Sequence, residues 1–129
     1  PFPTFYYATC PRLTGAISTL ESSGLMGQMN ERLQNDNDLA GRYKAAHLDY
    51  EAARSALAKQ ENINVPELAG VTAGGMPNRV KCLHSLIAHS LAAGFDVNPL
   101  GDEALIALDN WWLTKPCSEI SNLLDRQSN

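Results

Sequence analysis

The sequence predicts a mainly α-helical fold, a single compact domain of about five to six helices with a short extended or β element at the N-terminus. Two observations predict this class. Apolar residues recur at spacings of three and four over much of the chain, which is the period of an amphipathic helix. Breaks rich in glycine, proline and asparagine separate these runs, as expected where one helix ends and the next begins. A length of 129 residues is typical of one domain, so residues 1–129 are interpreted as a single helical domain.

The N-terminal part of the chain contains an extended segment and two short helices. Residues 4–9 are aromatic and partly β-branched, which favours a short strand or an extended segment. Pro11 suits the first position of a helix, because its missing N–H would have no partner there, and Gly24 is predicted to end that helix. A second short helix is expected over residues 25–33, followed by a polar turn.

The third helix has the clearest pattern, and Asn37 or Asp38 is predicted to cap it. One face of this helix is apolar, and the face opposite to it, which includes Glu51 and Arg54, is expected to be exposed to solvent. Residues 61–77 have no helical period and form a long loop, a kind of segment that is often functional. The apolar face of the third helix is a stripe that consists of Leu39, Tyr43, Ala46, Tyr50, Ala53 and Leu57.

The remaining helices are predicted from their caps. Asn78 is expected to cap a helix over residues 78–93 that Gly94 ends, and Asp102 is expected to cap a fifth helix that continues to about Trp112. A short last helix follows Pro116. Adjacent helical residues point about 100° apart, so one of Trp111 and Trp112 is interpreted as core and the other as boundary or interface.

Composition narrows the classes of function. The net charge of −4 weighs against a nucleic-acid binder, which usually carries a basic face. No apolar run reaches the roughly 18 residues that span a bilayer, and no signal peptide is visible, so no membrane association is expected. Three cysteines are an odd number, and free thiols in the cytoplasm are the simplest interpretation. Because the chain begins without methionine, an upstream segment is expected.

Cys10, Cys82, His84 and His89 are the candidates for a metal site or a reactive thiol. Cys10 precedes Pro11 and is expected at a helix N-terminus, where the helix dipole and nearby Arg12 favour a thiolate. On a continuous helix, Cys82 and His84 point about 200° apart and cannot bind one ion, while Cys82 and His89 lie about 10.5 Å apart along the axis. Each of these residues also has a purely structural interpretation, such as a buried, inert thiol for Cys82.

The stretch GGMPNRVK, residues 74–81, is a candidate anion site. Gly74, Gly75 and Asn78 precede or begin the predicted helix, and Arg79 and Lys81 would lie in its first turn. Free backbone N–H groups, the helix dipole and two cations together favour an anion. The stretch matches neither a phosphate-loop motif nor a dinucleotide fingerprint. Alternatively, the glycines only allow the backbone to turn and to pass close to another element.

The chain resembles a bacterial family catalogued as domain of unknown function 501. The stretches that carry the resemblance cover most of residues 1–108, and they are FPTFYYATCPRL, SSGLMGQMNERL, AGGMPNRVKCLHSLIAHSLAAG and NPLGDEAL. The resemblance implies an additional N-terminal segment with an Arg-Cys-Pro-like element, which could supply another thiol to a cluster with Cys10 and Cys82. The tail from about Asp109 departs from the family pattern, so Cys117 receives no support from it.

The sequence therefore leaves three functional hypotheses open. The favoured one is a small-anion or metal site where the Cys10 junction meets the helix over residues 78–93, with zinc or iron as the metal. The second is a non-enzymatic helical adaptor that binds a protein partner or a second copy of itself through Tyr and Trp residues and the loop over residues 61–77. The third is an enzyme that acts on a phosphorylated small molecule, and the sequence does not decide whether the protein is an enzyme.

Overall fold

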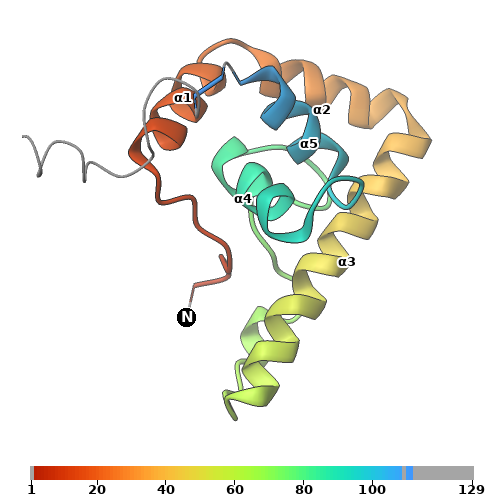
Figure 1. Cartoon of the computed structure of the whole chain (residues 1–129). Coiled ribbons are helices and arrows are strands. Elements are labelled where there is room, and N and C mark those ends of the chain that lie inside the picture. The colour runs from red at the N-terminus through yellow and green to blue at the C-terminus, as the bar shows by residue number, and fades with distance from the viewer. Residues whose placement is uncertain (1, 109, 112–129) are drawn as a thin grey trace, which may run out of the picture.

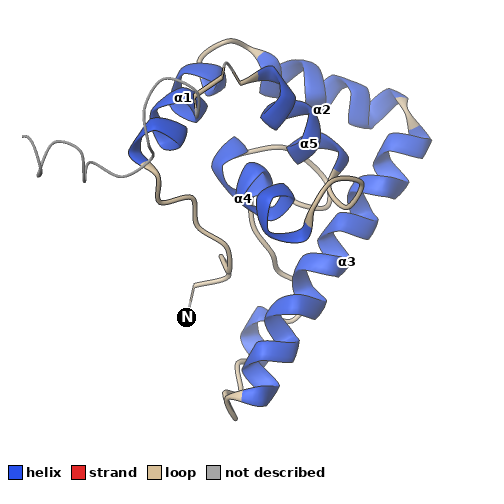
Figure 2. Cartoon of the chain, in the orientation of Figure 1, coloured by secondary structure: helices blue, strands red, loops and turns tan. Residues whose placement is uncertain are grey.

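The computed structural model describes residues 2–108 and 110–111, and within these residues it contains helices and connecting loops (Figure 1). The prediction of a mainly α-helical single domain is confirmed. Residues 4–9 are extended, and none of the described residues forms a strand (Figure 2). No helix in the described part of the chain is long and apolar enough to cross a membrane. The elements are α1 (Pro11–Glu21), α2 (Leu25–Asn35), α3 (Asn37–Gln60), the 3₁₀ helix η1 (Pro66–Leu68), α4 (Leu83–Ala93) and α5 (Pro99–Ala107).

Helix α4 lies in the middle of the molecule, with α3 along its right side in the view and α1, α2 and α5 above it (Figure 1). Its sequence is apolar on nearly every face, and most of its residues are buried, as expected for a helix that is enclosed by others. Gly101 of α5 lies directly against the backbone of Leu86 and the hydroxyl of Ser90, where a Cβ atom would collide with both. The close approach of α4 and α5 therefore depends on a glycine.

Helix α3 supports the N-terminal segment and the long loop through two side chains. The Tyr50 hydroxyl accepts hydrogen bonds from the backbone N–H groups of Phe5 (2.5 Å) and Tyr6 (3.2 Å). The Arg54 guanidinium donates to the carbonyl oxygens of Pro3 (2.6 Å), Leu68 (2.9 Å) and Val71 (2.5 Å). The prediction that Arg54 faces solvent is therefore wrong: it is buried because three carbonyl groups from two other segments need donors.

Two predicted helix starts are wrong in position, since each helix has a different cap. Asp36, not Asn37 or Asp38, caps α3 by accepting from the Leu39 N–H at 3.0 Å. Asn98, not Asp102, caps α5 by accepting from the Gly101 N–H at 3.0 Å.

Helix α4 also starts later than predicted, at Leu83 instead of Asn78, and Cys82 is its N-cap with an extended backbone (φ −150°, ψ 117°). Helix α5 ends at Ala107 and does not continue to Trp112. The predicted ends at Cys10, which is the N-cap of α1, and at Gly94, which is the C-cap of α4, are confirmed.

Candidate functional site

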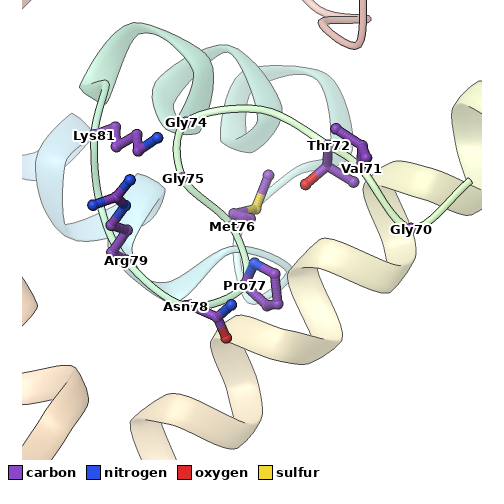
Figure 3. Close-up of a pocket in the computed structure, with 10 residues that line it drawn as sticks. All are labelled: Gly70, Val71, Thr72, Gly74, Gly75, Met76, Pro77, Asn78, Arg79 and Lys81. Atoms are coloured by element: carbon purple, nitrogen blue, oxygen red, sulfur yellow. The ribbon is translucent and has the colours of Figure 1, made fainter. Parts of the chain in front are cut away.

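The segment that leads into α4 is a closed loop, which we call the 70–81 loop (Figure 3). The Lys81 N–H donates to the Gly74 carbonyl at 2.7 Å, and the Arg79 N–H donates to the Gly75 carbonyl at 3.1 Å. Gly74 and Gly75 have φ values of 69° and 94°, which side-chain-bearing residues rarely adopt. A Cβ atom on Gly75 would lie 2.5 Å from the Arg79 carbonyl oxygen. Closure of this loop therefore requires both glycines.

Two distant side chains fix the end of the 70–81 loop. Asn30 of α2 accepts from the Val80 N–H at 2.7 Å and donates to the Val80 carbonyl at 3.0 Å. The Tyr43 hydroxyl of α3 donates to the Arg79 carbonyl at 2.9 Å, and burial raises the pKa of this hydroxyl. These bonds satisfy backbone groups that a helix would otherwise use, so residues 79–82 stay extended until α4 begins.

Burial alternates along this extended stretch. Arg79 and Lys81 are exposed, Val80 is buried in the core, and Cys82 is half-buried. This alternation is what an extended backbone imposes, because successive side chains point to opposite sides. Arg79 and Lys81 consequently emerge on the same side of the loop, as their side chains do in Figure 3.

A cavity of about 460 Å³ lies beside this loop. Its volume is within the range of small-molecule sites. Within the described part of the chain, neither Arg79 nor Lys81 forms an ion pair, so both charges are available to a ligand. The cavity is lined by Gly70, Val71, Thr72, Gly74, Gly75, Met76, Pro77, Asn78, Arg79 and Lys81.

All five predicted anion-binding residues, Gly74, Gly75, Asn78, Arg79 and Lys81, line this cavity. One part of the physical argument for them is nevertheless wrong. Because α4 begins at Leu83, neither cation lies in its first turn and Asn78 is not its cap. The cavity is therefore positively charged through two side chains, without the contribution of a helix N-terminus.

Of the four residues predicted for a metal site or a reactive thiol, two lie close to each other and two lie elsewhere. Cys82 and His84 do meet, because the helix geometry that separated them does not apply to an N-cap residue. They are joined by Glu21, the last residue of α1, and one ligand atom from each residue lies within 4.8 Å of the others. Glu21 was missed because no sequence spacing indicates that the end of α1 meets the start of α4.

His89 and Cys10 lie outside this cluster. His89 is fully buried and uses both ring nitrogens, with Nε2 at 2.9 Å from Asp49 and Nδ1 at 3.2 Å from the Asn98 amide. Cys10 is disulfide-bonded, whereas Cys82 is a free thiol. The prediction of a free thiol is therefore wrong for Cys10, because a disulfide-bonded sulfur cannot be a reactive thiolate.

The residues assigned to an adaptor surface are distributed unevenly. Tyr43 and Tyr50 are buried in the core, while Tyr7 is exposed. Trp111 packs against the core from a partly buried position. Trp112, Cys117 and the helix predicted after Pro116 lie outside the described residues.

Comparison with known proteins identifies a family. A family model described as "Protein of unknown function (DUF501)" matches residues 1–106, which contain every residue of the loop cavity and of the Glu21, Cys82 and His84 cluster. No curated protein and no solved structure matches the chain.

Proposed function

We propose that this chain, which belongs to the DUF501 family of proteins of unknown function, binds a small anionic ligand in the cavity beside the 70–81 loop. One observation carries the proposal. Arg79 and Lys81 emerge side by side at a cavity large enough for a small molecule, without an acidic partner among the described residues. Two unpaired cations held close together repel each other, and an anion between them relieves that repulsion.

The ordered backbone of the 70–81 loop supports anion binding in addition to the two positive charges. Asn30 and Tyr43 fix the backbone of residues 79–80, and the Lys81 N–H is bonded to the Gly74 carbonyl, so the origin of each cationic side chain is fixed before a ligand arrives. Thr72, in the wall of the cavity, is hydrogen bonded to His47 of α3 at 2.8 Å. A site that is already ordered loses less conformational entropy on binding.

The chemistry of the two cations favours a phosphate-bearing ligand. A guanidinium presents parallel N–H donors that match two oxygens of a phosphate or carboxylate, and an ammonium adds a point charge. Asn78 lines the same cavity, although its side chain points away from the two cations (Figure 3). A location in the cytoplasm stays a prediction from the sequence.

The experiment is a calorimetric titration of the protein with inorganic phosphate and pyrophosphate at low ionic strength. Arg79→Ala and Lys81→Ala are each expected to weaken binding roughly 10- to 150-fold, because a hydrogen bond to a charged group contributes roughly 1.5–3 kcal/mol. Arg42→Ala and Lys59→Ala remove exposed cations outside the cavity and are the matched controls. The proposal is wrong if the wild type binds neither anion, or if the cavity variants and the controls behave alike.

A further inference from the structure

We propose that Glu21, Cys82 and His84 form a zinc site with one open coordination position. These three side chains offer a carboxylate, a thiol and an imidazole, each of which is an established zinc ligand. Their potential ligand atoms lie within 4.8 Å of one another, and all three residues are half-buried. The site is separate from the anion cavity, which uses other side chains.

The fold brings these residues together from two helix ends. Glu21 is the last residue of α1, Cys82 is the N-cap of α4, and His84 is the second residue of α4. The extended backbone at Cys82 is essential, because a helix that continued through this residue would turn its side chain away from His84. The bonds of Asn30 and Tyr43 to residues 79–80 hold the backbone extended immediately before this point.

The distances require only small movements of side chains. Zinc–sulfur bonds of about 2.3 Å and zinc–nitrogen or zinc–oxygen bonds of about 2.0–2.2 Å place neighbouring ligand atoms roughly 3.3–3.6 Å apart in a tetrahedral site. His84 Nδ1 and Glu21 Oε1 are now 2.5 Å apart, as a hydrogen-bonded pair, and they would separate by about 1 Å to admit the ion. The Cys82 thiol is free, and within the described residues the Ser85 hydroxyl makes a weak contact with its sulfur at 3.9 Å.

The set of donors selects the metal. A thiolate and an imidazole favour zinc over magnesium or calcium, which prefer oxygen ligands. Deprotonated Cys82 and Glu21 together carry two negative charges, which neutralise a divalent ion. Three protein ligands leave the fourth tetrahedral position for water or an exogenous ligand, as in zinc sites that are not purely structural. The side chains of His84 and Glu21 are 33% and 22% exposed, so an ion can enter from solvent.

The test combines a residue-specific readout with affinities. Zinc is titrated into untagged wild-type protein, and alkylation of Cys82 by iodoacetamide is followed by peptide mass spectrometry with and without zinc. We expect one zinc per chain, slower alkylation of Cys82 in its presence, and a thiolate-to-metal absorption band when cobalt replaces zinc. Cys82→Ser and Glu21→Gln should each weaken zinc binding by at least about tenfold.

The matched control is Glu61→Gln, which removes an exposed carboxylate at the far end of α3 and should bind zinc as the wild type does. The site is disproved if zinc leaves the alkylation rate of Cys82 unchanged in the wild type, an outcome that does not depend on any variant folding. It is also disproved if Cys82→Ser binds zinc as tightly as Glu61→Gln. Because Cys82→Ser keeps Arg79 and Lys81, its titration with phosphate shows whether the anion site stands or fails separately.

Discussion

Asn30 and Val80 form a reciprocal pair in which the side-chain amide of one residue satisfies both backbone groups of the other, at 2.7 and 3.0 Å. The pair links α2 to the 70–81 loop across 50 residues of sequence. In the sequence, Val80 stands between Arg79 and Lys81, the two cations of the proposed anion site. Its two hydrogen bonds, one donated and one accepted, resemble those between paired residues of two β-strands, although one partner is a side chain on a helix. The position of the loop therefore depends on a residue far from it in the sequence.

Replacement of Asn30 by alanine should lower the free energy of unfolding by about 1–3 kcal/mol, because two partly buried backbone groups of Val80 lose their partner. The same change should weaken phosphate binding, since the backbone between Arg79 and Lys81 is released. Urea denaturation and calorimetry measure the two effects. Asn35→Ala, on the exposed surface of the same helix, is the control and should change stability by less than about 0.5 kcal/mol. Equal effects of the two variants would contradict this role for Asn30.

Stability should fall as the pH rises above about 10, where tyrosines of the unfolded chain ionise. Burial raises the pKa of Tyr43, and burial together with Asp49 and Tyr50 raises the pKa of Tyr6. The folded state therefore keeps protons that the unfolded state loses. This contribution is fully present below the unfolded pKa and is lost as the pH rises, with a slope of up to about 1.4 kcal/mol per pH unit for the buried Tyr43 and a smaller slope for the partly exposed Tyr6.

Tyr43→Phe tests the assignment of that slope. The variant should show a shallower loss of unfolding free energy between about pH 9 and 11, because one of the shifted groups is gone. Near neutral pH it should be about 1 kcal/mol less stable, because the hydrogen bond to the Arg79 carbonyl is lost. Tyr7→Phe, at an exposed position, is the control. A slope as steep in Tyr43→Phe as in the wild type would exclude Tyr43 as its source.

Two glycine-to-alanine substitutions in helices should have opposite effects. Gly101→Ala places a Cβ against the Leu86 backbone and the Ser90 hydroxyl, and it should destabilise the fold by about 1–3 kcal/mol. Gly41→Ala, in α3, meets open space and should stabilise by roughly 0.5–1 kcal/mol through helix propensity. Thermal or urea unfolding measures both. If Gly101→Ala also stabilised the protein, the close approach of α4 and α5 would not be as described.

The sequence predicted those features that depend on neighbours along the chain. The stripe of α3 is buried at Leu39, Tyr43, Ala46 and Tyr50, as its period indicated. It fails at Leu57, which is 44% exposed, because the C-terminal end of α3 extends beyond the other helices (Figure 1). Periodicity identifies the apolar face of a helix but not how far along the helix other elements cover it.

The errors at Asn78, Arg54 and Glu21 occur where contacts over long sequence separations decide the structure. Asn78 has the right chemistry for a helix cap, yet α4 begins at Leu83 because Asn30 and Tyr43 bind the backbone of the preceding residues. Arg54 looks like a surface residue until three carbonyl groups from other segments surround it. The five residues of the proposed anion site lie in one short stretch of sequence, so their shared position beside one cavity could be anticipated. Glu21 was missed because only the tertiary fold brings it to Cys82 and His84.

Because the stretch over residues 79–82 is extended, the two proposed sites are sensitive to whether an insertion or deletion before it has an odd or an even number of residues. Because alternate side chains face opposite ways, a deletion or insertion of a single residue between Pro77 and Arg79 would exchange their surroundings. Arg79 and Lys81 would then turn toward the core, and Val80 would face the cavity. An indel of two residues would keep the alternation. This alternation is a constraint familiar from strands, although this chain has no strand among its described residues.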